Sequence, residues 1–366
     1  MTFDPWFRNR LIRDGILAAI HERMQQDPSI YILGEGAHMK VHFDSPSIER
    51  DFPDRVITLP ISEDSNTNFA VGLSLAGLTP IVDVITSDFL FRTMDAICNT
   101  AAKQATVSEP RCVVIRAEFI TGGPTTGQRI ESLFAHIPGL RVVVPSNLRD
   151  AKILMLEALQ HKGVTIFFED RTIPDSAQTD AGPHTLDINC IYPLDPQRPV
   201  PAARVTNFIL PYPPKTTVVA YGLTASQLQK PRALLCSGCN GDGGRHPRAN
   251  PSEAEAADPR PFGPCPGCYG GWDSTYELID LRYLYPLDIE TILESARRTK
   301  RLLVVEPDST FMGIGAEIIA QVAEEVPGCK VKRLGAPRMT IPACRDLHSK
   351  LLCTSDEIIA AIGSLR

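Results

Sequence analysis

Apolar residues follow two different periods along the first half of the chain. They recur at helical spacing over residues 8–25, 66–78, 89–105 and 148–161. Short and nearly continuous apolar runs separate these segments, at 31–36, 56–62, 79–85, 111–117, 140–146 and 164–170. Strands that are apolar on both faces are typical of parallel sheets covered by helices on each side. The pattern therefore predicts an α/β domain with a parallel sheet over residues 1–175.

The second half of the chain predicts another parallel-sheet domain of the same class over residues 216–366. Its expected strands and helices lie at 216–222, 276–282 and 301–307, and at 288–298, 313–325 and 355–364, respectively. Residues 176–215 have no clear period and many prolines, so we interpret them as a linker. The first two strands are 53 residues apart, whereas a crossover needs about a dozen. We interpret 230–272, rich in Gly, Pro and Cys, as an insertion.

Length and composition agree with two globular domains. The chain has 366 residues, of which 43% are hydrophobic and 22% charged, so it is neither disordered nor fibrous. A net charge of −6 gives no electrostatic support for a nucleic-acid partner. No apolar run approaches the roughly 18 residues of a membrane helix, so we expect no membrane association. The N-terminus lacks a secretory apolar core, so we expect a cytoplasmic protein.

Glu63 is the first candidate for chemistry. It directly follows the predicted strand 56–62. The carboxyl ends of parallel strands are where such sheets bind ligands. The spacing alone favours a different interpretation, an acid at the N-cap or in the first turn of the following helix, where the helix dipole stabilises it.

Five segments in sequence order carry a family resemblance: GEG at 34–36, and the stretches 59–103, 134–152, 277–307 and 313–325. Together they resemble the β subunit of the thiamine-diphosphate-dependent 2-oxoacid dehydrogenases of the pyruvate, branched-chain and acetoin types. The resemblance implies a transketolase-like pyrimidine-binding domain followed by a transketolase-like C-terminal domain. It covers nearly the whole chain except the insertion.

The resemblance assigns a role to each of several residues. Glu63 matches the glutamate that hydrogen-bonds the cofactor's aminopyrimidine ring and favours the imino tautomer that removes the thiazolium proton. Phe89 matches the aromatic residue that stacks on the pyrimidine, although a core Phe is the alternative. Ile61 and Ile85 match positions that line the pyrimidine pocket, and Glu35 matches an acid near the same site.

One departure from the family concerns a catalytic histidine. The family has an HSQ-like loop, and counting back from His136 places Thr126 at the His position with Gln128 retained. Thr cannot act as an acid or base near neutral pH. Either the reaction does not need the histidine, or His38 or His42 replaces it, or the protein is inactive. The resemblance therefore makes Thr126 a catalytic position with altered chemistry.

A complete thiamine site also needs a half that binds Mg²⁺ and the diphosphate, which the family carries on a separate α subunit. The GDGG at 241–244 lies in the Cys-rich segment, and Asn250 follows it too closely, so we treat it as a coincidental match. The resemblance thus implies an α partner, an α₂β₂ heterotetramer, and an acyl-carrier or lipoyl-type acceptor protein.

Four of the ten cysteines form a separate pattern, CxxC–x₂₅–CxxC, at Cys236, Cys239, Cys265 and Cys268. Four thiolates at this spacing suit tetrahedral Zn²⁺ in a structural site. An iron–sulfur centre or redox-active dithiols are the alternatives. The sequence predicts a zinc-type insertion whose role it does not specify.

Together these observations predict the β subunit of a thiamine-dependent enzyme that decarboxylates a 2-oxoacid or transfers an acyl or ketol fragment. The missing histidine favours a specialised metabolic reaction. Two alternatives remain, a split transketolase subunit and a non-catalytic β-like scaffold. The retained Glu63 and Phe89 argue against the scaffold.

Overall fold

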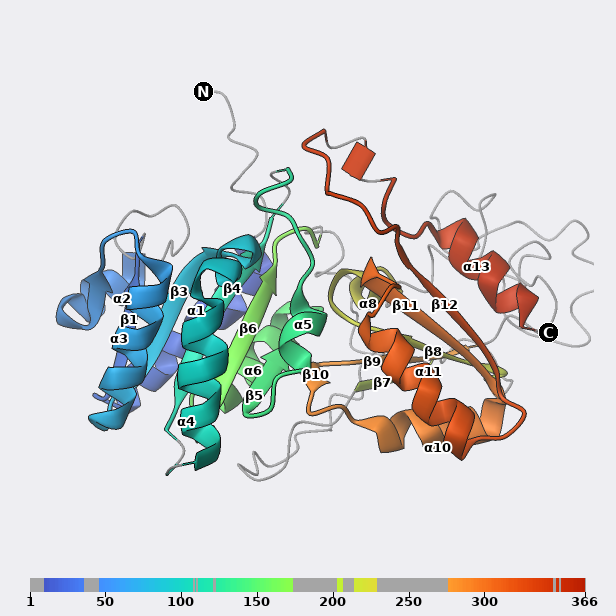
Figure 1. Ribbon diagram of the computed structural model, residues 1–366, viewed down its shortest axis with the longest axis horizontal. Coiled ribbons are helices and arrows are strands. Elements are labelled where there is room, and N and C mark those ends of the chain that lie inside the picture. The colour runs from blue at the N-terminus through green and yellow to red at the C-terminus, as the bar shows by residue number, and fades with distance from the viewer. Residues whose placement is uncertain are drawn as a thin grey trace, which may run out of the picture.

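A computed structural model describes two neighbouring sheets with helices packed on them (Figure 1). The described residues are 10–35, 46–107, 109, 111–120, 123–173, 203–206, 214–228, 276–344, 347–348 and 350–365. The predicted insertion 230–272 lies outside them. The predicted linker 176–215 is described only at 203–206 and 214–215.

The first sheet has seven strands in the order β10-β5-β6-β4-β3-β1-β2. The first half of the chain supplies β1 (Ile30–Gly34), β2 (Val56–Thr58), β3 (Thr79–Thr86), β4 (Val113–Phe119), β5 (Leu140–Val143) and β6 (Val164–Asp170). These six strands pair in parallel. The central strands β4 and β6 are buried along their whole length, which confirms the parallel sheet predicted from continuous apolar runs.

Helices cover both faces of this sheet. On one face α1 (Arg10–Gln26) packs against α6 (Leu148–Ala158), and both bury their apolar stripes. The other face is covered by α3 (Glu63–Leu75) and α5 (Glu131–Ala135). Shorter elements complete the domain: α2 (Pro46–Asp51), the 3₁₀ turns η2 (Pro53–Arg55) and η3 (Ser87–Thr93), the π-helical turn η4 (Ala96–Ala101), and α4 (Ala102–Val107).

The predicted helix 89–105 is therefore not one regular helix. Its span is divided among η3, η4 and α4, which have 3₁₀, π and α geometry in turn. Sequence periodicity does not distinguish these geometries here, because the buried residues Leu90, Thr93, Ile97 and Ala101 recur every three to four positions, as in one α-helix. Irregular helical turns of this kind often occur near functional sites.

The second sheet has five strands in the order β12-β11-β8-β9-β7. They are β7 (Ala203–Thr206), β8 (Thr216–Ala220), β9 (Tyr276–Asp280), β11 (Arg301–Ser309) and β12 (Lys330–Ala336). Its helices are α8 (Gly222–Leu228), α10 (Ile289–Thr299), α11 (Ile314–Glu325) and α13 (Ser355–Ser364). Strand β7 pairs antiparallel with β9, so part of the predicted linker belongs to this sheet.

The two halves share more structure than two separate domains would. Strand β10 (Tyr283–Tyr285), from the second half, joins the edge of the first sheet antiparallel to β5. One hydrophobic cluster also runs from Phe134 and Phe168 of the first half to Leu284 and Val304 of the second. The junction is therefore a continuous packed core.

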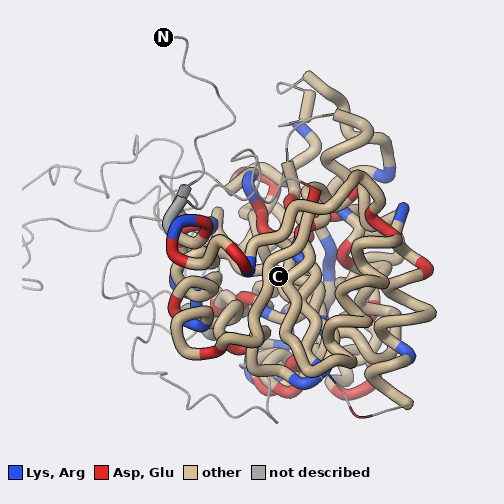
Figure 2. Tube along the Cα trace, turned by 90° about the vertical axis from the view of Figure 1, so that its left-hand side faces the viewer, with Lys and Arg blue, Asp and Glu red and all other residues tan. Residues whose placement is uncertain are grey.

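The charged positions of the described chain are mixed in sign. Acidic and basic residues are interspersed along the visible tube, in keeping with a small net charge (Figure 2). Among the described residues no helix has both the length and the apolarity needed to cross a lipid bilayer.

Candidate functional site

The carboxyl ends of three neighbouring strands bring the predicted acidic residues together. Glu35 follows β1, Glu63 begins α3 shortly after β2, and Ile85 lies near the end of β3. Because β1 pairs in parallel with both β2 and β3, these three positions share one edge of the sheet. The resemblance assigns all three residues to one cofactor site, and the topology places them at one edge of the sheet.

Glu63 and Glu35 form a connected acidic pair around the start of α3. Glu63 is 7% exposed, and Arg92 donates to its Oε2 from 3.2 Å. Glu35 is half-buried, and its Oε1 accepts the backbone N–H of Ser62, the N-cap residue, at 2.9 Å. Burial, followed by the charge of Glu63, raises the pKa of Glu35. The pair is therefore suited to hold a proton next to a ligand.

The predicted hydrophobic wall of the pocket is only partly covered within this chain. Phe89 in η3 is half-buried against the main core, and Ile85, four residues earlier, is also half-buried. Ile61, by contrast, is 83% exposed. An exposed isoleucine one step before the N-cap of α3 leaves this side of the site open.

Thr126 lies in a turn that is docked on η3. Its N–H donates to Gly123 O at 3.3 Å, and its half-buried side chain has an enclosed Oγ1 with no hydrogen-bond partner among the described residues. Two residues later, the backbone of Gln128 is held by Ser87 Oγ and Asp88 Oδ2, at 2.8 and 3.0 Å. The structure thus brings the Thr126 loop next to the turn that carries Phe89.

A buried ion network below the site was not predicted from the sequence. Arg116 on β4 is fully buried and contacts Asp83, Glu118 and Glu169. Arg13 and Arg171 also bind Glu118, at 2.7 and 2.9 Å. One feature of the sequence could have predicted this network, namely the two charged residues inside the otherwise apolar strand 113–119. Buried charges need partners of opposite charge.

A second unpredicted cluster of acids lies at the junction of the two halves. Glu131 is fully buried, and neither carboxyl oxygen has a hydrogen-bond partner among the described residues. Burial, and then the charge of Asp308, raises the pKa of Glu131 to about 8. Glu306 and the enclosed Tyr221 hydroxyl belong to the same environment, and burial raises the pKa of Glu306 to about 7. Glu131 therefore holds a proton at neutral pH.

Comparison with known proteins agrees with this arrangement. Residues 10–174 match the family described as the transketolase pyrimidine binding domain, and residues 273–358 match the transketolase C-terminal domain. The pyruvate dehydrogenase E1 component subunit beta of Gracilaria tenuistipitata var. liui is 30% identical over 97% of this chain and 98% of its own length. The chain belongs to this β-subunit family of thiamine-diphosphate-dependent 2-oxoacid dehydrogenases.

Further relatives bear out the family assignment. The pyruvate dehydrogenase E1 component subunit beta of Rickettsia bellii is 28% identical over 96% of this chain and 97% of its own length. The acetoin:2,6-dichlorophenolindophenol oxidoreductase subunit beta of Cupriavidus necator is 27% identical over 97% and 96%. A solved structure, a split gene transketolase as an inactive beta4 tetramer, shares the fold with a TM-score of 0.69 and 19% identity, covering 97% of each chain.

Some predicted residues of this β-subunit family member lie outside the described part of the chain. They are the four cysteines of the predicted zinc site and the two histidines considered as substitutes for the missing one: Cys236, Cys239, Cys265, Cys268, His38 and His42. No group that could hold a metal ion occurs among the residues that the structure describes. The zinc site therefore stays a prediction.

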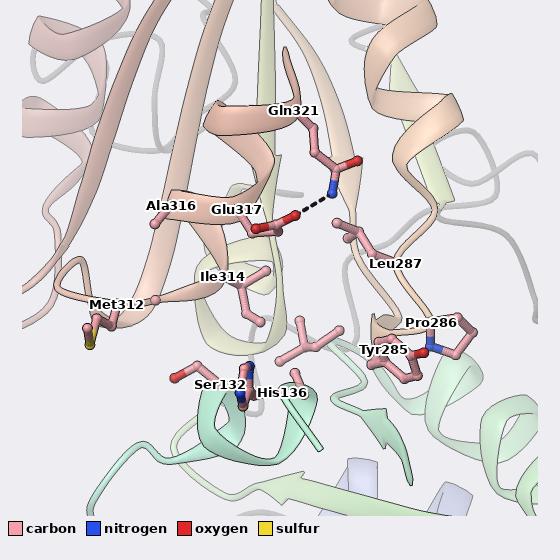
Figure 3. Close-up of a pocket in the computed structure, with 13 residues that line it drawn as sticks. Ser132, His136, Tyr285, Pro286, Leu287, Met312, Ile314, Ala316, Glu317 and Gln321 are labelled. Carbon is pink, nitrogen blue, oxygen red and sulfur yellow. Dashed lines mark hydrogen bonds between the residues drawn. The ribbon is translucent and has the colours of Figure 1, made fainter. Parts of the chain in front are cut away.

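A cavity of about 680 Å³ lies between α5 and α11 (Figure 3). Ser132 and His136 line it from α5 and the turn that follows, and Tyr285 and Leu287 line it from the segment around β10. On α11 the carboxylate of Glu317 accepts a hydrogen bond from Gln321 at 2.7 Å. The predicted thiamine-site residues are absent from the described lining of this cavity, so it is a separate feature of the β subunit.

Proposed function

We propose that this chain supplies the aminopyrimidine half of a thiamine diphosphate site as a β subunit. The enzyme it belongs to would decarboxylate a 2-oxoacid or transfer an acyl or ketol fragment. The observation that carries the proposal is the buried Glu63 carboxyl at the N-terminus of α3, directly beside Glu35. Family membership supports the same conclusion.

The residues at this edge fit an aminopyrimidine. A carboxyl group of Glu63 can share a proton with a ring nitrogen, and Phe89 and Ile85 offer apolar surface for the ring. Among the described residues, the Glu63 carboxyl has a single hydrogen bond, to Oε2 from the exposed Arg92. Its other oxygen is therefore available to a ligand.

Each of these residues has a distinct part in the proposed mechanism. Bound thiamine diphosphate supplies the carbanion chemistry, as cofactors of this kind do. Glu63 holds or releases a proton at its carboxyl oxygens, and Glu35 fixes the start of α3 through Ser62 so that Glu63 stays in place. Arg92 donates a hydrogen bond to Oε2 of Glu63 and thereby helps to orient this carboxyl group. The Thr126 hydroxyl, unpartnered within the described chain, lies in the neighbouring loop and would select the substrate rather than transfer protons.

A partner is needed to complete the site. The exposed Ile61 leaves the pocket open on the side of the α3 N-terminus, where an α subunit carrying Mg²⁺ and the diphosphate would close it. We propose an α₂β₂ heterotetramer, an acyl-carrier or lipoyl-type acceptor protein, and a cytoplasmic location. The relatives are named as subunits of E1 components, which supports a partner subunit.

The Cys-rich segment would bind one structural Zn²⁺ through Cys236, Cys239, Cys265 and Cys268. Metal analysis of the purified complex should give one zinc per chain. Double replacement by serine at Cys239 and Cys268 should remove it, whereas Cys98→Ser should not. Equal zinc content in the three proteins would refute the site.

The central experiment uses this chain co-purified with its α-like subunit. Calorimetry with Mg²⁺ measures thiamine diphosphate binding, and assays with 2-oxoacids and ketol donors measure turnover. We expect Glu63→Gln to lower kcat by roughly 10²–10⁴-fold, the range for a positioned acid or base. Asp64→Asn, the exposed neighbour on the same helix turn, is the matched control. Absent binding, or turnover indifferent to Glu63, would refute the catalytic proposal and leave a scaffold.

A further inference from the structure

We propose that Asp83 is a positioning residue of the cofactor site, which holds Ile85 in a left-handed backbone conformation and thereby fixes the apolar wall of the pyrimidine pocket. This inference rests on the proposed function. It extends the site from the residues that line the pocket to a buried carboxylate that the ligand does not touch.

A β-bulge places Ile85 in this position. Strands β3 and β4 are in register at Asp83 and Arg116, and again at Thr86 and Glu118. Three steps along β3 therefore oppose two steps along β4, so β3 contains one extra residue. Bulges of this kind redirect a side chain and are common next to active sites.

Ile85 adopts a conformation that its side chain disfavours. Its φ is 70°, in the left-handed region. For a β-branched residue this is a genuine outlier, because Cβ and its branches crowd the backbone. Such strain persists only where the surroundings enforce it, and it is concentrated at functional sites.

Asp83 provides the enforcing contact. Its Oδ1 accepts the backbone N–H of Ile85 at 3.1 Å, across the bulge. Its Oδ2 lies 3.1 Å from Nη1 of Arg116, with both side chains buried. One oxygen of the carboxylate therefore faces each neighbour, and the side chain links the strained residue to the core.

The backbone on the other side of Asp83 is packed equally tightly. A Cβ at Gly34, its partner on β1, would lie 2.9 Å from Asp83 O and 3.0 Å from Asp83 Cβ. Only glycine allows this close approach of the two strands. Since Glu35 directly follows Gly34, Asp83 also lies next to the acidic pair, and its charge contributes to the raised pKa of Glu35.

Arg116 makes this arrangement rigid. In the described structure it belongs to a buried network in which three arginines face three carboxylates: Arg13, Arg116, Arg171, Asp83, Glu118 and Glu169. The charges balance, and the surrounding ion pairs hold each carboxylate in a fixed place. Breaking such a buried network is strongly destabilising, which keeps Asp83 from turning away from Ile85.

Loss of the hydrogen bond between Asp83 and the Ile85 N–H would also affect the residues that follow Ile85 in the chain. Without it, Ile85 would relax to a negative φ and its side chain would leave its present position. Ser87, which holds the Gln128 loop, and Phe89 come directly afterwards. One hydrogen bond therefore controls the entry of the chain into η3.

Asp83→Asn tests the proposal without changing side-chain size. An amide has one acceptor oxygen, which cannot serve both neighbours, and the charged Arg116 is the stronger donor. We expect the Ile85 amide to exchange hydrogen at least roughly tenfold faster. We expect the Kd of the αβ complex for thiamine diphosphate to rise roughly tenfold, equivalent to about 1.4 kcal/mol. Asp54→Asn, at an exposed acid of η2, is the control.

A second variant separates positioning from general damage. Glycine takes a φ of 70° without steric cost. In an Ile85→Gly background, Asp83→Asn should therefore change the Kd much less than it does in the wild type. An equal change in both backgrounds would mean that Asp83 acts by another route.

The remaining outcomes are also distinct. Hydrogen exchange of the wild-type Ile85 amide at the unprotected rate would overturn the proposal, and this measurement stands even where Asp83→Asn fails to fold. Faster exchange with an unchanged Kd would overturn the positioning role alone. A wild-type complex that binds no thiamine diphosphate would refute the proposed function, and the positioning role with it.

Discussion

The buried Glu131 carboxyl should make the stability of this protein fall as the pH rises. Asp308 from β11 faces it with a like charge, as does Asp170 from β6 more weakly, and Arg129 opposes them. The neighbouring Tyr221 hydroxyl is enclosed and carries no charge at these pH values. The folded chain therefore keeps a proton on Glu131.

The direction of this pH dependence follows from which state, folded or unfolded, binds the proton. The pKa of Glu131 is raised from 4.5 to about 8. Between these pH values the folded state holds a proton that the unfolded state releases, so the free energy of unfolding decreases with pH. At about 1.4 kcal/mol per pH unit the full effect is about 5 kcal/mol. Because Asp308 shares the titration, we expect about 2–5 kcal/mol.

Glu131→Gln should remove this loss, because the amide stays neutral at every pH. We expect urea unfolding, followed by far-UV circular dichroism, to give similar free energies of unfolding for variant and wild type at pH 5. At pH 9 the variant should be more stable by about 2–5 kcal/mol. Glu324→Gln, at an exposed acid of α11, is the control. An effect of Glu131→Gln that is the same at pH 5 and pH 9 would refute the reasoning.

Other substitutions test the packing that holds the site. Phe134→Ala, at a fully buried ring of the shared core, should cost about 3–5 kcal/mol in urea unfolding, and a cost below about 1 kcal/mol would contradict the single core. Gly139 has a φ of +91°, and a Cβ there would lie 2.4 Å from Ala102 O. Gly139→Ala should therefore lower the Tm by several degrees. Gly72→Ala, where a Cβ would meet nothing within 4 Å, is the control and should not lower the Tm. Thr354→Ala removes a capping box and should cost about 1 kcal/mol, measured in the same way; no change would mean that α13 does not need its cap.

The sequence alone was sufficient to predict most of the strands. Apolar runs predicted β1 to β6, β8, β9 and β11, because strands covered by helices on both faces are mostly apolar. It did not predict β7, β10 or β12. The burial pattern of β12 is exposed to half-exposed, and β10 has three residues, so neither has an apolar signature of its own.

The candidate site was likewise predictable from the sequence only in part. The family resemblance predicted Glu63, Glu35, Ile85 and Phe89 as site residues, and the topology places the first three at one edge of the sheet. Nothing in the spacing indicated that Ile85 has a positive φ, because a bulge depends on the partner strand as well as on its own residues.

The sequence of this protein by itself determined local features: the period of strands and helices, the turn residues, and a motif order that identifies the family. Tertiary structure decided which charges are buried and what they face. Asp83 meets Arg116 from another strand, and Glu131 meets Asp308 from the other half of the chain. Electrostatic energies depend on distance and on exclusion of water, and both exist only once the segments are packed together.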